Sequence, residues 1–220
     1  AFDIASEILE AEAKRNLEES QKVSLNVSEY EKFCDTFKFT ETPDQERVIR
    51  EVIADLLSDK PQDRLICGEV GFGKTEVALR ASFIVAQNDY QVCILAPTTV
   101  LAKQHFEVFK ERFSEFPYRI CLLTREQTKV EKAEIYKKIK ENYFSIIIGT
   151  HALFNKEISF MNLNLLIIDE EHKFGVRQKE QIRSLKNGIN VISLSATPIP
   201  RTLNLSLSKV RDISLITTPP

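Results

Sequence analysis

The sequence has few of the residues that build fibrous or cross-linked proteins. Its 220 residues include only six glycines, eight prolines and four cysteines, which excludes a collagen-like chain and a disulfide scaffold. The apolar runs are too short to cross a bilayer, and we expect no signal peptide because no basic segment precedes an apolar stretch near residue 1. The remaining composition, 43% hydrophobic and 28% charged, is typical of a globular protein with a full core.

The cysteines are far apart and form no CxxC pair. They are Cys34, Cys67, Cys93 and Cys121, and the last three lie in apolar runs. Buried, inert thiols are the expected reading of this pattern. We therefore expect no metal site built on cysteine, and a reducing cytoplasm as the location.

The net charge is −2, but the charge is unevenly distributed. Acidic residues outnumber basic ones in residues 1–60, and basic residues are in excess after residue 100. The overall charge does not indicate a nucleic-acid-binding protein. Any nucleic-acid site must be local, and the C-terminal two thirds of the chain is the place to expect it.

From residue 64 onward, short apolar runs alternate with amphipathic segments. This alternation predicts repeated βαβ units, and so an α/β fold with a mostly parallel, doubly wound sheet and helices on both faces. The predicted strands are Leu65–Gly68, Val92–Ala96, Arg119–Leu123, Ser145–Gly149, Leu163–Asp169 and Asn190–Ser195, and the predicted helices span residues 74–87, 99–114, 128–141 and 178–187.

The N-terminal part predicts helices of another kind. Residues 2–20 carry a narrow apolar stripe, which is typical of a peripheral or connecting helix. Ser28 is a candidate cap for a short helix that ends at Phe37. Thr42 and Pro43 are an N-cap and a first helical residue. The predicted buried face of the helix that follows is formed by Val48, Ile49, Val52, Ile53, Leu56 and Leu57.

Residues 68–75 read GEVGFGKT and match the phosphate-loop pattern G-x-x-x-x-G-K-[ST] at every fixed position. Glycines let backbone N–H groups turn toward phosphate oxygens at the start of a helix. Lys74 would neutralise the β and γ phosphates, and Thr75 would bind Mg²⁺. The alternative is a glycine-rich turn with a solvated lysine. The predicted nucleotide-binding residues are Gln45, Gly68, Glu69, Val70, Gly71, Phe72, Gly73, Lys74, Thr75 and Glu76.

Acidic residues follow the apolar strand at 163–169. At this edge of a parallel sheet ligands bind, so Asp169 is the second predicted Mg²⁺ ligand and Glu170 would orient or deprotonate the attacking water. Together with Lys74 they are the predicted catalytic residues. A solvated strand end is the alternative when the acids are considered alone.

Two sequence features bear on which nucleotide base the site would bind. The Asn/Thr-Lys-x-Asp segment by which GTPases read guanine is absent, so ATP is the expected nucleotide. Gln45 is a candidate for adenine recognition. An exposed amide in the first turn of a helix is the equal alternative.

The ordered motifs TPDQ (42–45), GEVGFGKT (68–75), APTT (96–99), GTH (149–151), DEEH (169–172) and SAT (195–197) resemble the first motor domain of superfamily 2 helicases and translocases. The longer segments at 68–78, 169–180, 195–201 and 216–220 are similar to the bacterial transcription-repair coupling factors. Helicases of the RecG type share FGV and SATPIPRT, but usually have a small residue in place of Phe72 and lack TPDQ.

The resemblance implies a RecA-like P-loop NTPase domain over residues 40–220, preceded at 1–39 by a connecting helix and linker. It implies an ATP- and Mg²⁺-dependent translocase on double-stranded DNA, which displaces stalled RNA polymerase and couples transcription to nucleotide excision repair. The polymerase and the damage-recognition protein would bind through domains outside this chain. A second RecA-like domain downstream would supply an arginine to the site, so we expect this chain alone to hydrolyse ATP poorly.

The resemblance also assigns roles to single residues. Phe39 would lie over the base. Arg177 and Arg201 match positions linked to remodelling and motif coupling. The residues that would couple the γ-phosphate to the DNA track are His172, Ser195 and Thr197, and those beside the DNA backbone are Thr98, Thr99, Lys103, Arg125, Thr150 and His151. For each DNA candidate taken alone, a solvated or helix-capping role is an equal alternative.

Three other functions compete with this reading. A RecG-like fork-remodelling helicase would share the chemistry but differ in its partner. A nucleotide-gated binding module would use ATP only to set a conformation. A metabolic P-loop kinase would leave the GTH and SAT segments unexplained.

Overall fold

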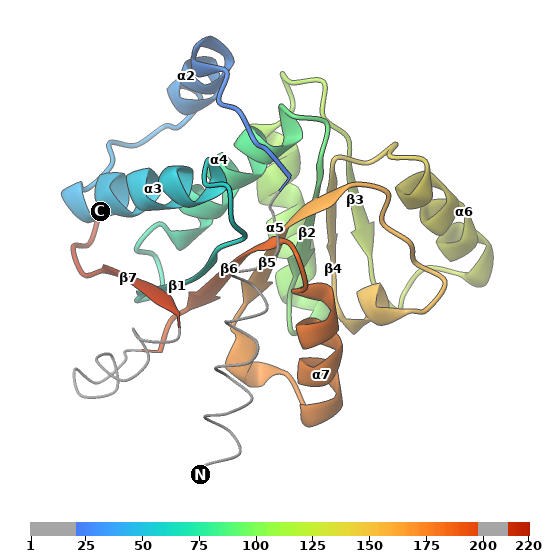
Figure 1. The fold of residues 1–220 in the computed structure, drawn as a ribbon. Helices are drawn as coiled ribbons and strands as arrows, with labels where there is room; N and C mark the ends of the chain where they lie inside the picture. Colours follow the sequence, from blue (N-terminus) through green and yellow to red (C-terminus); the bar gives the residue numbers. More distant parts are fainter. Residues whose placement is uncertain (1–20, 198–210) are drawn as a thin grey trace.

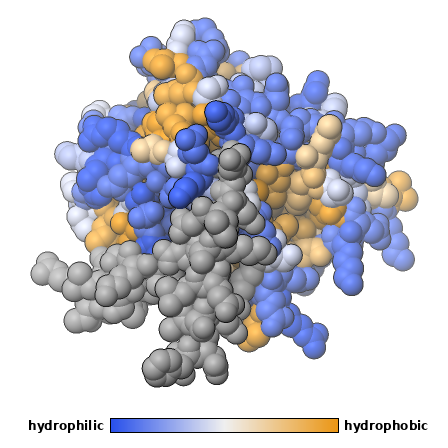
Figure 2. Space-filling model, viewed as in Figure 1, coloured by the Kyte–Doolittle hydropathy of each residue, from blue (hydrophilic) through white to orange (hydrophobic). Residues whose placement is uncertain are grey.

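A computed structural model describes residues 21–197 and 211–220 of the chain (Figure 1). The helix expected over residues 2–20 and the residue Arg201 lie outside these ranges. In the view of Figure 2 hydrophilic residues cover most of the coloured surface, and hydrophobic residues lie in separate, smaller areas. None of the described helices is long and apolar enough to span a membrane.

A parallel sheet forms the centre of the domain. Its strands run in the order β3-β4-β2-β5-β6-β1-β7, and all their pairings are parallel. The bounds are β1 Asp63–Gly68, β2 Gln91–Leu95, β3 Ile120–Leu123, β4 Ile146–Gly149, β5 Leu163–Asp169, β6 Asn190–Ser195 and β7 Asp212–Ile216. The six predicted strands are confirmed to within two residues, and β7 was not predicted.

Helices cover both faces of the sheet. The described helices are α2 Val27–Asp35, α3 Pro43–Leu56, α4 Lys74–Ala86, α5 Thr99–Arg112, α6 Lys129–Lys140 and α7 Val176–Leu185, with short 3₁₀ turns η1 His151–Phe154 and η2 Glu171–Lys173. Along β2, Val92 and Ile94 pack into a core with α4 and α5, whereas Cys93 and Leu95 pack with α6 and α7. The doubly wound α/β fold is therefore confirmed.

The cysteines behave as the sequence predicts. Cys67, Cys93 and Cys121 are buried and Cys34 is partly buried, and all four are free thiols. Burial raises the pKa of Cys93 to about 12. This thiol therefore stays protonated and packs as a small apolar side chain.

The start of α3 follows its local signals. Thr42 accepts a hydrogen bond from the Gln45 backbone N–H, the Gln45 side chain accepts one from the Thr42 N–H, and Pro43 occupies the first turn. For α2 the expected cap is wrong. Asn26, not Ser28, accepts from the Glu29 N–H at 3.3 Å, because an asparagine oxygen satisfies a free helix N–H as well as a serine hydroxyl does.

Helix α2 shares its core with the rest of the domain. Phe33 is fully buried, and its ring stacks on Phe83 with centroids 4.3 Å apart. The rings of Phe113 and Phe116 lie 4.9 and 5.4 Å away. Part of the predicted connecting segment therefore packs against α4 and α5, although the boundary placed at residues 39 and 40 stays a prediction.

We predict that Phe33→Ala lowers the free energy of unfolding by about 3–5 kcal/mol, because it leaves a cavity among aromatic rings. Urea unfolding followed by circular dichroism measures this loss. Phe39→Ala is the matched control, since Phe39 is 72% exposed and its truncation should change stability by less than about 0.5 kcal/mol. Equal effects of the two substitutions would show that α2 contributes nothing to the core.

Candidate nucleotide site

The phosphate loop connects β1 to α4. Gly68 is the last residue of β1, and Gly71 and Gly73 have φ angles of +87° and +82°. L-residues with side chains rarely adopt these angles, so both positions favour glycine. Gly73 directly precedes α4, so the loop ends at a helix N-terminus, where backbone N–H groups point toward an anion. Val70 forms the tip of the loop and is exposed.

Gln45 fastens the loop to α3. Its side-chain N–H donates to the Phe72 carbonyl at 2.9 Å, while its oxygen accepts from the Thr42 N–H at 3.0 Å. A Cβ on Gly73 would lie 2.3 Å from Gln45 Nε2, so a residue other than glycine at this position would displace the Gln45 side chain. Gln45 is only 2% exposed. The structure thus gives this residue a positioning role at the loop, and adenine recognition stays a prediction.

Lys74 turns back onto the loop. Its Nζ donates to the carbonyl of Gly68 at 2.5 Å and to that of Glu69 at 2.8 Å. Burial lowers the pKa of Lys74, and the negative charges of Glu170 and Asp169 oppose this shift. The ammonium group therefore lies where a phosphate could replace the two carbonyl oxygens as its partner.

Asp169 ends β5 on the same edge of the sheet as the phosphate loop. Its carboxylate accepts a hydrogen bond from His105 Nε2, on α5, at 2.8 Å, and both side chains are largely buried. Sequence reasoning missed His105, because nothing local in an amphipathic helix shows which histidine will meet an acid 64 positions away. His105 fixes the orientation of the proposed metal ligand.

Glu170 contacts the end of β6, the SAT segment and His172. It adopts a left-handed conformation with φ of +50°, and its backbone N–H donates to the Leu194 carbonyl at 2.8 Å. Its carboxylate accepts from the Ala196 N–H at 2.8 Å and lies 3.3 Å from His172 Nδ1. The DEEH and SAT segments are thus in direct contact, although Thr197 itself is exposed and its N–H donates to Ser195 Oγ at 3.1 Å.

Glu76 belongs to a buried ion-pair network rather than to the open loop. Its carboxylate accepts from Arg80 and from Arg112, each at 2.8 Å. Burial raises the pKa of Glu76, and the two arginines oppose the shift. Arg80 also pairs with Glu41, and Arg112 donates to Thr36. These contacts hold the chain between α2 and α3 beside α4 and α5.

A cavity of about 670 Å³ lies next to the loop. Its walls include both predicted base contacts, Phe39 and Gln45, together with Phe37, Thr75 and Pro220. A nucleotide base and ribose would fit in a cavity of this size with mixed apolar and polar walls. The network around Glu76 forms part of the same wall.

The candidate DNA contacts follow the carboxyl ends of three strands. Thr98 caps α5 and accepts from the Leu101 N–H at 3.2 Å, as its capping alternative predicts. Lys103 pairs with Glu126 at 2.6 Å. Thr150 is buried and its hydroxyl has no hydrogen-bond partner among the described residues. Of the other candidate DNA contacts, Arg125 and His151 are exposed and Thr99 is partly exposed. Arg177, which the resemblance links to remodelling, is exposed in the first turn of α7.

Comparison with known proteins shows which families this chain resembles. The family model for the DEAD/DEAH box helicase matches residues 42–205. The chain is 47% identical to the transcription-repair-coupling factor of Haemophilus influenzae and 45% identical to that of Escherichia coli, in each case over 99% of this chain and 19% of the relative. The chain therefore spans about a fifth of the length of these two relatives. A solved structure of RecG bound to a three-way DNA junction covers 94% of this chain and 28% of RecG, with a TM-score of 0.82 and 32% identity.

We predict that Gly73→Ala weakens nucleotide binding by about tenfold or more, because a Cβ would displace Gln45 and distort the loop. Binding of a fluorescent ATP analogue measures the effect. Gly188→Ala is the matched control for backbone strain, since Gly188 also has a left-handed φ, of +72°, but is no part of the loop. Equal affinity of the two variants would contradict the role assigned to Gly73.

We also predict that His105→Ala raises the Mg²⁺ concentration needed for half-maximal nucleotide binding by about tenfold, which is typical of losing a residue that orients a metal ligand. A Mg²⁺ titration of analogue binding measures it, and His105→Gln should restore part of the loss by donating a similar hydrogen bond. Gln104→Ala, an exposed neighbour on α5, is the control. An unchanged Mg²⁺ requirement in His105→Ala would refute the positioning role.

Proposed function

The chain belongs to the DEAD/DEAH box helicase family, and on this premise we propose that it is the first RecA-like motor domain of a transcription-repair coupling factor. The whole protein would translocate on double-stranded DNA by hydrolysing ATP, displace stalled RNA polymerase and recruit excision repair. The observation that carries this proposal is the identity of 45–47% across 99% of the chain to relatives of that name.

A RecG-like fork-remodelling helicase is the second candidate. Its support is the TM-score of 0.82 with RecG, at the lower identity of 32%. The two candidates share the motor chemistry and differ in their partners. To separate them, the complete protein is mixed with a stalled transcription complex or with a three-way DNA junction. The substrate that stimulates ATP hydrolysis identifies the function.

The residues of the loop suit ATP and Mg²⁺. Two left-handed glycines shape the loop, and a Cβ at Gly73 would displace the Gln45 side chain that supports it. Hydroxyl and carboxylate oxygens are ligands that Mg²⁺ prefers. Thr75 and Asp169 would hold the metal, which when bound neutralises phosphate charge. Lys74 would leave its loop carbonyls for the β and γ phosphates.

Glu170 would act on the attacking water. Its carboxylate would accept a proton from the water as the water oxygen bonds to the γ phosphorus. The bond from this phosphorus to the bridging oxygen would break and release ADP, and Lys74 would offset the charge that develops on the phosphates. Because Glu170 also accepts from the Ala196 N–H, a change at the γ-phosphate would reach the segment of Ser195 and Thr197 directly. His172, 3.3 Å from Glu170, is the other proposed coupling residue.

The DNA backbone would run along the carboxyl edge of the sheet. Thr98, Thr99, Lys103, Arg125 and His151 would make contacts that position the duplex without reading its sequence. Thr150 would support the segment that follows β4 from inside the domain, because its side chain is buried. We propose a cytoplasmic location, with RNA polymerase and the damage-recognition protein bound by parts of the protein outside these 220 residues.

We predict that the 220-residue chain hydrolyses ATP slowly, with or without duplex DNA. Joining it to the second RecA-like domain in one polypeptide should raise turnover by about 10³–10⁵, the range that an arginine finger supplies in nucleotide hydrolases. Steady-state phosphate release measures both rates.

Glu170→Gln is the control for this experiment, and it should abolish turnover in the longer polypeptide while nucleotide binding persists. Equal turnover in the two polypeptides would mean that the site is complete without a second domain. In that case the two-domain motor would be rejected. ATP binding with no turnover in either polypeptide would favour a nucleotide-gated binding module.

A further inference from the structure

A C-terminal strap, residues 217–220, borders the phosphate loop. It continues from β7, which pairs with β1 so that Ile216 lies opposite Gly68. The Ile216 carbonyl would be 3.0 Å from a Cβ on Gly68. Leu215, Ile216 and Thr217 line a cavity of about 240 Å³ together with Gly68 and neighbouring loop residues, and Pro220 lines the larger cavity beside Gln45. The strap thus contributes to the walls of two cavities that adjoin the loop.

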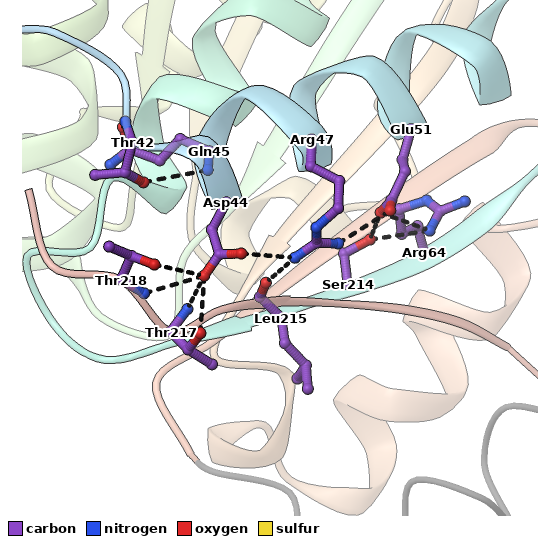
Figure 3. A network of polar contacts seen from close by, with 10 residues as sticks. All are labelled: Thr42, Asp44, Gln45, Arg47, Glu51, Arg64, Ser214, Leu215, Thr217 and Thr218. Carbon is purple, nitrogen blue, oxygen red and sulfur yellow. Dashed lines mark hydrogen bonds and ion pairs between the residues drawn. The ribbon is translucent and has the colours of Figure 1, made fainter.

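Asp44 holds this strap in place (Figure 3). Its Oδ2 accepts four hydrogen bonds, from the N–H and the hydroxyl of Thr217, both at 2.8 Å, and from those of Thr218 at 3.1 and 3.0 Å. Its Oδ1 accepts from Arg47 at 3.2 Å. The hydrogen bonds from Thr217 hold the pKa of Asp44 far below its usual range. The carboxylate is therefore ionised at neutral pH, and its bonds are the stronger, charge-assisted kind.

A second row of contacts anchors the strand before the strap. Arg47 donates to the Leu215 carbonyl at 2.5 Å and pairs with Glu51 at 3.0 Å. Ser214 donates to Glu51, and Arg64 donates to Ser214 at 2.9 Å. Figure 3 shows these side chains in a line between α3 and β7. The contacts of Asp44 with the strap are thus the end of a continuous row of polar contacts between α3 and β7.

Asp44 and Gln45 are neighbours in the first turn of α3, but they reach different partners. Gln45 donates to the Phe72 carbonyl of the phosphate loop, whereas Asp44 binds Thr217 and Thr218. One helical turn therefore joins the loop and the strap through side-chain hydrogen bonds. A shift of the loop that moves Phe72 would be transmitted to the strap through this turn.

We infer that Asp44 is a positioning residue that holds the strap against the nucleotide site and couples the two. Release of the strap weakens nucleotide binding, and nucleotide binding protects the strap, because coupling between two sites is reciprocal. This inference rests on the proposed function, which places a nucleotide at the loop. It assigns a role to the aspartate of TPDQ and to both threonines of the strap.

The test compares Asp44→Asn with the unchanged chain. Hydrogen exchange of the Thr217 and Thr218 amides, followed by mass spectrometry, reports the strap without any nucleotide. Exchange should become faster by about tenfold or more in the variant, as expected when charge-assisted hydrogen bonds are lost. The dissociation constant of a non-hydrolysable ATP analogue should rise by a similar factor, and the analogue should slow exchange of the two amides in the unchanged chain.

Glu46→Gln is the matched control. Glu46 is an acid in the same first turn, is exposed, and lies 3.8 Å from Arg50, so its substitution should change neither measurement. The double variant Thr217→Val, Thr218→Val removes two of the four donors and leaves the start of α3 intact. It should reproduce both effects in part, and it decides the question if Asp44→Asn fails to fold.

The possible outcomes separate the two claims. If the unchanged chain does not bind the analogue, the proposed function fails, while the exchange data still report the strap. If the variants release the strap but bind the analogue with unchanged affinity, the coupling is refuted. If the two amides exchange at the unchanged rate in the variants, Asp44 does not hold the strap.

Discussion

Parallel pairing around β1 is the constraint on which the whole site depends. β1 lies between β6 and β7, with Cys67 opposite Ser195 and Gly68 opposite Ile216. β5 lies next to β6, so Asp169 is opposite Leu194. Because every strand runs the same way, the phosphate loop, the DEEH acids, the SAT segment and the strap all emerge at one edge. The sheet is covered on both faces, so that edge is the place where polar chemistry can meet a ligand.

The left-handed residues at this edge show how the chain meets that constraint. At Gly71 and Gly73 the absence of a Cβ makes the conformation inexpensive. Glu170 adopts it with a full side chain, which costs about 1–2 kcal/mol. The bonds of Glu170 to Leu194 and Ala196 compensate for this cost. The conformation turns the Glu170 carboxylate toward the SAT segment, where it accepts from the Ala196 N–H.

Local signals explain which parts of the structure could be predicted. β5 and β6 were predicted to the residue, because their apolar runs end in polar side chains. The start of α3 follows from Thr42 and Pro43. By contrast, β7 carries the buried polar residue Ser214, and its partner Arg64 lies 150 positions away. The strand is only five residues long, and its sequence DISLI is neither a continuous apolar run nor a strict alternation of apolar and polar residues.

Contacts between distant segments could not be predicted for a related reason. His105 meets Asp169, and Arg112 meets Glu76, only after helices have packed on the sheet. Residue types alone allow many other pairs. The predicted roles of Gln45 in adenine recognition and of the threonines and cations in DNA binding depend on ligands, and they therefore stay predictions. What the fold adds is the position of each side chain relative to the edge.

The first turn of α3 illustrates how one short motif can serve several purposes. Thr42 caps the helix and Pro43 starts it. Successive side chains on a helix point about 100° apart, which lets Asp44 and Gln45 reach the strap and the loop from adjacent positions. The helix N-terminus also favours a negative charge, so an ionised carboxylate is stable there. A glutamine that only read adenine would not require this neighbour. The contacts of Asp44 give the aspartate of TPDQ a physical reason that base recognition alone does not supply.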